Sequence, residues 1–152
     1  MSNEESSQQG QRLAERIAEV LYDQDRASKA LGIQIQEIRP GYARLSMVVR
    51  PDMTNGHRIG HGGLVFTLAD SAFAFACNSH NESNVAAAAS IDFLAPAHEG
   101  DELTAVATEL WRSGRSGIYE ITVTNQKGAR VALFRGRSAR IAGQVVSDPH
   151  EI

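Results

Sequence analysis

The order of hydrophobic and polar positions along the chain predicts two helices and a series of strands. Residues 1–10 are polar, and we expect them to be disordered. Apolar residues then recur at helical spacing over residues 11–23, which predicts an amphipathic helix. Those apolar residues are Leu13, Ile17, Val20 and Leu21. Residues 27–31 are expected to add one further turn, ended by Gly32.

Alternating apolar and polar residues follow, and they predict a β-hairpin. One strand is expected over residues 33–38 and a second over residues 42–49, with a Pro-Gly turn between them. After a loop comes a long apolar segment. It predicts a buried helix over residues 62–79.

The second half of the chain predicts four strands. The segment 85–93 is ambiguous, because its four consecutive alanines favour helix by propensity. We assign it to a strand because it is short, follows a loop and stops at Pro96. The other strands are expected over residues 102–112, 118–125 and 130–141, joined by hairpin turns.

These elements predict one domain of the α+β class over residues 11–143. An antiparallel sheet is expected to wrap around the long central helix, because this is the one apolar helix between the strands. The helix is apolar on nearly all sides, so one sheet face cannot cover it, and a second subunit is expected to bury the remainder. Residues 144–152 are polar and are expected to form a loose tail.

Asp70 is the only full charge between Arg58 and Glu82, and it lies in the apolar helix. Desolvating a carboxylate is costly, and no Lys or Arg lies within two helical turns to pair with it. The residue is therefore either satisfied by hydrogen bonds, as a cap of a neighbouring loop, or used in chemistry. Its sequence context leaves both interpretations open.

Gly62 and Gly63 lie where the central helix is expected to begin. The first turn of a helix carries free N–H groups and a partial positive charge, and glycine lets a ligand atom approach them. A carbonyl oxygen bound there would be polarised, as in an oxyanion hole. The alternative is a glycine-rich turn that only reverses the chain.

Composition and charge exclude several classes of function. The chain has 152 residues and a net charge of −3, which argues against a general nucleic-acid binder. Cys77 is the only cysteine, and this fits a reducing compartment. The polar N-terminus lacks the apolar core of a secretory signal, and no segment is long and apolar enough to span a membrane. We expect a cytoplasmic protein with no nucleic-acid or membrane partner.

Short motifs between about Gly32 and Gly143 carry a resemblance to a known family. They are Asn55-Gly56-His57, His61-Gly62-Gly63, Leu68-Ala69-Asp70 with Ala72-Phe73-Ala74, Ile91-Asp92-Phe93-Leu94 with Pro96, Gly117-Ile118-Tyr119, and Ala132-Leu133-Phe134-Arg135-Gly136. Together they resemble the hotdog-fold acyl-CoA thioesterases, and within them the PaaI-like group associated with phenylacetate degradation. The Asn loop, the His-Gly-Gly sequence and the Asp are specific as a combination.

The resemblance implies a hotdog fold and hydrolysis of acyl-CoA thioesters such as phenylacetyl- or hydroxyphenylacetyl-CoA. Asp70 would be the catalytic carboxylate, and Gly62 would offer the backbone N–H that polarises the thioester carbonyl. His61 and Asn55 would position the thioester or the attacking water. Ser71 follows Asp70 where some relatives carry Thr, so the role of its hydroxyl stays open.

Further substrate contacts are expected beside these residues and on the last strands. They are Gly63, Ser71, Arg115, Ser116, Gly117, Arg135 and Arg137. Arg135 and Arg137 share strand parity and project from one face of the sheet. That face either meets the phosphates of CoA or is simply solvated.

We expect no metal and no cofactor, since CoA is part of the substrate. His57 and His61 have no third His or Cys at ligand spacing. Ser71 lacks the Gly-x-Ser-x-Gly context of a hydrolase nucleophile, and Cys77 lacks an activating neighbour.

Asp70 would either attack the thioester carbon, giving an anhydride, or take a proton from water. Two other functions are considered. One is a hotdog-fold enoyl-CoA hydratase or dehydratase, in which His61 would act with an acid. The other is a non-catalytic acyl-CoA sensor, although the chain has no spare length for an output module.

The spacing of Gly62 and Asp70 predicts shared active sites. Eight positions of helix separate them by about 12 Å, which is too far for one thioester to meet both in one chain. Two antiparallel copies of the helix can bring Asp70 of one against Gly62 of the other. We expect a homodimer with composite sites, assembled further into a homotetramer.

Overall fold

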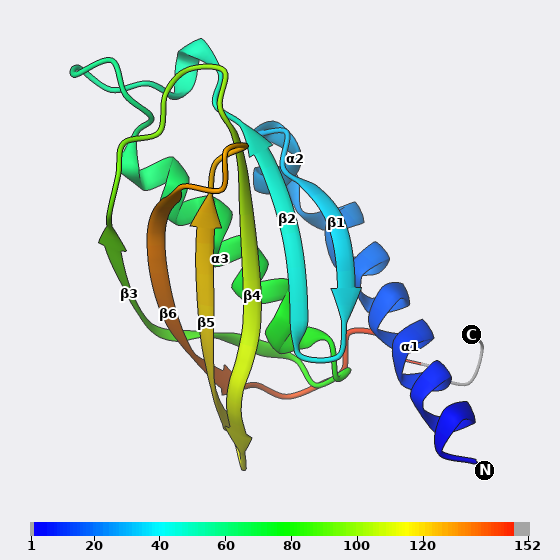
Figure 1. Cartoon of the computed structure of the whole chain (residues 1–152). Coiled ribbons are helices and arrows are strands. Elements are labelled where there is room, and N and C mark those ends of the chain that lie inside the picture. Colours follow the sequence, from blue (N-terminus) through cyan, green and yellow to red (C-terminus); the bar gives the residue numbers. More distant parts are fainter. Residues whose placement is uncertain (1, 148–152) are drawn as a thin grey trace.

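A computed structural model describes residues 2–147 of the chain (Figure 1). Its helices are α1 (Asn3–Gln24), α2 (Arg26–Ala30) and α3 (Gly62–Asn78). A short 3-10 turn, η1 (Pro51–Met53), precedes α3. Its strands are β1 (Gln34–Arg39), β2 (Tyr42–Val48), β3 (Asn84–Phe93), β4 (Glu102–Ser113), β5 (Ser116–Thr124) and β6 (Arg130–Arg140). Among the helices described, none has the length and apolar character needed to cross a membrane.

The strands form a six-stranded antiparallel sheet in the order β1-β2-β4-β5-β6-β3. Figure 1 shows α3 lying across one face of this sheet. Along β5, Gly117, Tyr119, Ile121 and Val123 are buried and alternate with more exposed residues, so one face of the strand meets the core. The predicted α+β fold, with an antiparallel sheet around the central helix, is confirmed.

One side of α3 is packed tightly on the sheet. Leu68 is fully buried, and the Phe73 ring lies 5.4 Å from the ring of Tyr119 and 6.1 Å from that of Phe134. A Cβ atom at Gly136 would stand only 2.8 Å from the Phe73 ring, so glycine is what lets β6 approach the helix. The close contact of Gly136 with Phe73 sets the distance between α3 and the sheet.

The opposite side of α3 is open. It carries residues that follow one another at helical spacing and all remain at least partly exposed: Gly63, Thr67, Asp70 and Ala74. Three of these four are small, and the fourth is the carboxylate. The sheet of one chain therefore leaves a narrow stripe of the helix uncovered, with Asp70 in it.

The N-terminus differs from the prediction, because α1 begins at Asn3 rather than near residue 11. Ser2 and Glu5 form a capping box: the Ser2 hydroxyl accepts from the Glu5 N–H at 3.2 Å, and the Glu5 carboxylate accepts from the Ser2 N–H at 2.8 Å. Glu4 and Glu5 also suit the positive end of the helix. Residues 3–10 are therefore helical although they bury little surface; Met1 lies outside the described residues.

The C-terminal segment is partly anchored. Asn81 adopts a left-handed conformation and makes two hydrogen bonds to Val146, at 2.9 and 3.0 Å. The chain just before and after Val146, residues 145–147, is therefore held against the domain as a series of bends. The rest of the expected loose tail, residues 148–152, lies outside the described residues.

The two edges of the sheet differ in how they are covered. At the β1 edge, α1 places polar side chains on backbone carbonyls: Gln11 Nε2 donates to the Ile38 carbonyl and Tyr22 Oη to the Ile33 carbonyl, each at 2.7 Å. At the other edge, residues 85–90 of β3 are exposed on both faces. One edge is thereby occupied by the chain itself and the other is free to pair.

Glu109, in the C-terminal half of β4, links the sheet to the C-terminal end of α3. Its carboxylate accepts from Tyr119 Oη at 2.7 Å and lies 2.9 Å from His80 Nε2, in the turn after α3. Burial alone would raise the pKa of Glu109, but the hydrogen bonds from Tyr119 and His80, together with the nearby charge of Arg112, outweigh it and lower that pKa. The ionised carboxylate therefore holds α3 in register with β4 and β5.

Candidate active site

The N-terminus of α3 is built around His61. His61 is the N-cap of the helix, and its Nδ1 atom accepts the Gly63 N–H at 2.9 Å. The His61 N–H donates to the Met53 carbonyl at 2.8 Å, which ties the helix start to the preceding loop. Because Nδ1 is an acceptor, the neutral ring carries its proton on Nε2. His61 is thus set to donate a hydrogen bond rather than to take a proton.

Gly62 keeps the free N–H group. Within residues 2–147 its N–H has no hydrogen-bond partner, whereas those of His61 and Gly63 are both used. A first-turn N–H with no acceptor is the kind of donor that binds a polarised carbonyl oxygen. Of the two glycines that the sequence singled out, the geometry favours Gly62 for this role.

The Asn55 loop lies against the same end of α3. Asn55 Oδ1 accepts from the N–H groups of His57 and Ile59, at 2.9 and 3.3 Å, so the side chain holds its own turn closed. Its Nδ2 donates to no residue in the described part of the chain. This amide remains available to a water or to a thioester oxygen.

A cavity of about 460 Å³ opens between this loop and the end of β3. Asn55 and Gly62 border it, and apolar residues supply most of its wall, among them Val65, Phe93 and Val131. The Phe93 ring is packed close to the helix start, because a Cβ atom at Gly62 would lie 3.0 Å from Phe93 Cζ. The cavity suits a small apolar group whose polar end reaches Gly62.

Asp70 lies on the open side of α3, two turns further along. Burial raises the pKa of Asp70, and neither a hydrogen bond nor an ion pair offsets this within residues 2–147. The carboxylate is therefore not a cap of a neighbouring loop. A half-buried carboxylate without a partner is typical of a group kept for chemistry.

Gly62 and Asp70 belong to the same helix but not to the same site within one chain. Both lie in α3, which is continuous over Gly62–Asn78, so about 12 Å of helix rise separates them. The reacting carbon of a thioester must lie about 3–3.5 Å from the attacking atom. Within one chain, Gly62 and Asp70 are therefore too far apart to act on one thioester carbonyl.

Ser71 and Cys77 have structural roles in this chain: one makes a hydrogen bond between helices and the other is buried. The Ser71 hydroxyl lies 3.0 Å from that of Ser28, which donates to Asp25 at 2.6 Å, so Ser71 links α3 to α2. Cys77 is buried, and burial raises the pKa of its thiol to about 12, which leaves it inert. No group of three or more His, Cys, Asp or Glu suited to a metal ion occurs in the described chain.

The substrate contacts expected on the last strands do not lie together. Gly117 is buried beneath Tyr119, and a Cβ atom there would clash with that ring at 2.8 Å. Ser116 lies at the start of β5, next to the exposed Arg115. Arg135 and Arg137 project from the face of the sheet turned away from α3, because Phe134 points toward the helix.

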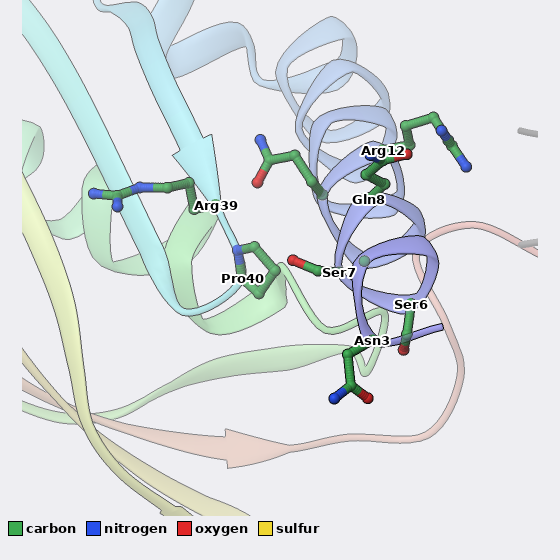
Figure 2. A pocket seen from close by; sticks show the side chains of 9 residues that line it. Asn3, Ser6, Ser7, Gln8, Arg12, Arg39 and Pro40 are labelled. Atoms are coloured by element: carbon green, nitrogen blue, oxygen red, sulfur yellow. The ribbon is translucent and has the colours of Figure 1, made fainter. Parts of the chain in front are cut away.

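A larger cavity, of about 850 Å³, lies between the N-terminal half of α1 and the β1–β2 turn. Figure 2 shows its side chains spread along α1 and at Arg39 and Pro40, without converging on one point. Neither Asp70 nor Gly62 borders it. Its size alone gives it no catalytic role.

Sequence reasoning placed Phe93 in a motif but did not assign it to the site. Its position beside Gly62 depends on how the end of β3 returns to the start of α3, and no local pattern reveals that contact. The sequence held an indirect signal. Phe93 is a large aromatic residue at the end of an alanine-rich strand, where the neighbouring small side chains offer little to pack on, so a contact with another segment was to be expected.

Comparison with known proteins agrees with this fold. The model of the Thioesterase superfamily matches residues 57–132. The acyl-coenzyme A thioesterase PaaI of Escherichia coli K12 is 46% identical over 131 residues, covering 86% of this chain and 94% of that protein. The structure of E. coli PaaI, from the phenylacetic acid degradation operon, superposes with a TM-score of 0.87 over 88% of this chain and 97% of its own. The TT0310 protein from Thermus thermophilus is 36% identical, with a TM-score of 0.75 over 78% and 99%.

Proposed function

The chain belongs to the thioesterase superfamily, and from this premise we propose that it hydrolyses acyl-CoA thioesters with an arylacetyl group, such as phenylacetyl- or hydroxyphenylacetyl-CoA. One observation carries the proposal: the free Gly62 N–H borders an apolar cavity at the start of α3. A thioester carbonyl oxygen fits the N–H, and an aromatic acyl group fits the cavity beside Phe93. The similarity to E. coli PaaI supports the same substrate class.

The proposed chemistry needs Asp70 at the thioester carbon. The Gly62 N–H draws electron density toward the carbonyl oxygen, and the carboxylate either attacks the carbon or takes a proton from a water that attacks it. The C–S bond then breaks, and the CoA thiolate takes a proton. In the first route water hydrolyses the anhydride and restores Asp70. We propose that no metal or further cofactor takes part.

A homodimer through the free edge of β3 supplies the missing half of each site. Two antiparallel β3 edges would pair and place the open stripes of the two α3 helices against each other. Asp70 of one subunit then faces Gly62 of the other, and the dimer holds two composite sites. The exposed β3 residues and the small residues of the stripe support this arrangement.

Two such dimers are proposed to form a tetramer across the outer face of the sheet. Leu110 and Trp111 of β4 are each about half exposed there, at 50% and 52%. Sedimentation equilibrium distinguishes a mass of four chains from one of two. We also propose a cytoplasmic location, in keeping with the buried, reduced Cys77, and cell fractionation tests it.

The geometry of His61 disfavours a hydratase. A hydratase of this fold would need His61 as a base, but its Nδ1 already accepts the Gly63 N–H and its Nε2 carries the proton. Through Nε2–H the ring can donate a hydrogen bond to a carbonyl oxygen or a water, but it is poorly placed to abstract a proton.

A substrate screen tests the function directly. We expect phenylacetyl-CoA and hydroxyphenylacetyl-CoA to give kcat/KM about three- to tenfold above fatty acyl-CoAs, because an aryl group gains an aromatic contact with Phe93. Thiol release measures turnover, and an enoyl-CoA serves as the control. Hydration of the enoyl-CoA without thioester cleavage would contradict the proposal.

A further inference from the structure

The hydrogen bond between α2 and α3 at Ser71 has a direction, which its neighbours determine. Asp25, the N-cap of α2, accepts twice from Ser28: Oδ1 from the Ser28 N–H at 2.9 Å and Oδ2 from the Ser28 hydroxyl at 2.6 Å. A hydroxyl has one proton to donate, and an ionised carboxylate can only accept, so the Ser28 proton is committed to Asp25. The 3.0 Å contact between the hydroxyls of Ser28 and Ser71 is therefore a donation from Ser71 to Ser28.

This direction leaves Ser71 as an acceptor. Its proton points toward Ser28, which is only 1% exposed, whereas Ser71 itself is partly exposed on α3. A helical Ser or Thr commonly donates to the carbonyl four residues earlier, as Thr67 does to Gly63 at 2.9 Å. Within residues 2–147 Ser71 makes no such bond to its own helix. The Asp25–Ser28 pair thus holds the Ser71 hydroxyl away from the helix backbone, with a lone pair still free.

Asp70 and Ser71 are placed to hold one water between them. They are consecutive in α3, and helical geometry turns their side chains about 100° apart, so they do not bond to each other. Two acceptors that share a water lie about 4.5 Å apart, a span that suits neighbouring side chains diverging in this way. Around the helix axis, Ala74 falls between the two, and its small, exposed side chain leaves the space beside them open.

We propose that Asp25 and Ser28 are positioning residues, which make Ser71 the second acceptor for the water that Asp70 activates. Asp70 takes one proton of this water, and the water oxygen bonds to the thioester carbon. The C–S bond then breaks, and the CoA thiolate takes the proton from Asp70. Ser71 accepts a hydrogen bond throughout and transfers no proton. The inference rests on the proposed function and selects its water route over the anhydride route.

Competition between water and methanol tests this arrangement. Water has two protons and uses both acceptors, whereas methanol has one proton, which Asp70 takes, and a methyl group in place of the other. In Ser71→Ala we expect the ratio of methyl phenylacetate to phenylacetate formed from phenylacetyl-CoA to rise about three- to tenfold, the value of one hydrogen bond. The kcat of hydrolysis should fall by a similar factor, with KM within about twofold of the wild type. Ser71→Thr keeps the hydroxyl and should keep the wild-type ratio.

Asp25→Asn separates the direction of the hydrogen bonds from their number. Asn caps a helix as well as Asp does, so α2 should keep its start. With Asn Oδ1 on the Ser28 N–H, Asn Nδ2 meets the Ser28 hydroxyl as a donor, and the chain reverses: Ser28 donates to Ser71, whose proton turns outward. We expect the same rise in the ester ratio as in Ser71→Ala, with no change of volume at Ser71 and little change in Tm.

Ser79→Ala is the matched control. Its hydroxyl is also buried next to α3, where it accepts from the Gly41 N–H and donates to the Ala76 carbonyl, each at 2.7 Å. Loss of these bonds should lower Tm and leave the ester ratio unchanged. A purely structural Ser71 would behave in the same way, because a loosened site slows attack by water and by methanol together.

The other outcomes are equally decisive. A wild type that cleaves no acyl-CoA refutes the proposed function itself. A wild type that hydrolyses phenylacetyl-CoA, with the ester ratio unchanged in folded Ser71→Ala and Asp25→Asn, refutes only this inference, and ester formed by none of these proteins counts as unchanged. A rise in Thr67→Val instead would make Thr67 the second acceptor and overturn the inference. Oxygen label from labelled water that enters Asp70 in a single turnover would also overturn it, because only the anhydride route puts the label there.

Discussion

Replacing Asp70 with Asn is expected to lower turnover of phenylacetyl-CoA by about 10²–10⁴-fold. Asn is nearly isosteric with Asp but can neither attack the thioester carbon nor take a proton from water. The half-buried Asp70 carboxylate has no partner within residues 2–147 that the substitution would break. Steady-state kinetics with purified Asp70→Asn measures the loss.

The same substitution should not destabilise the protein. Burial raises the pKa of Asp70, so the ionised carboxylate is disfavoured in the folded state. A carboxyl group with a raised folded pKa contributes stability below its unfolded value of 3.8, and this contribution is lost as the pH rises through the folded pKa. At pH 7 the Asn variant should therefore melt at the wild-type temperature or above it.

The two readouts together separate a catalytic role from a structural one. A structural Asp70 would lose stability on substitution, whereas a catalytic one loses turnover and keeps or gains stability. The wild-type kcat should also fall on the acid side at a pH above that of an ordinary Asp, since the carboxylate must be ionised to act. Near-native turnover in a folded Asn variant would remove Asp70 from the mechanism.

Mixing two inactive variants is expected to restore activity. Asp70→Ala and Asn55→Ala should each be nearly inactive as homodimers. In a mixed dimer one composite site collects both substitutions, and the other keeps Asn55 from one chain and Asp70 from the other. This follows from the position of Asn55 beside Gly62 at the start of α3, about 12 Å of helix rise away from Asp70.

The size of the recovery is set by statistics. Random exchange makes half of the dimers mixed, and each of these has one intact site of two, so co-refolded mixtures should reach up to about a quarter of wild-type activity. Native mass spectrometry of chains with different tags verifies the exchange. Verified exchange without recovery would return Asp70 and Gly62 to a site within one chain.

The sequence predicted the fold well because its strongest signals are periodic. Buried and exposed residues alternate along β5, and α3 is a run of apolar residues, because the strand and the helix are buried against each other. The structure packs α3 on the sheet as predicted. The alanines of β3 favoured helix by propensity, yet pairing with β6 makes them a strand. Tertiary pairing therefore outweighed propensity, and the length and flanks of the segment were the better guide.

The missed parts depend on short-range chemistry or on contacts between distant segments. The helix start at Ser2 was readable from the Ser-x-x-Glu capping box, although the polar composition suggested disorder. The resemblance singled out the Gly62 N–H, but the residues alone could not distinguish it from that of Gly63, whose N–H is used by His61 Nδ1. The separation of Arg135 from Arg115 needed the register of the sheet.

The unequal edges of the sheet also decide how far it can grow. A sheet with two free edges can add copies at both sides without end, which is the geometry of a fibril. Here Gln11 and Tyr22 of α1 already occupy carbonyls of the β1 edge, and only β3 can accept another strand. In the proposed dimer, pairing through β3 would use up that edge in both copies at once. The N-terminal helix would then act as a terminator that limits edge-to-edge growth to two chains and disfavours polymerisation.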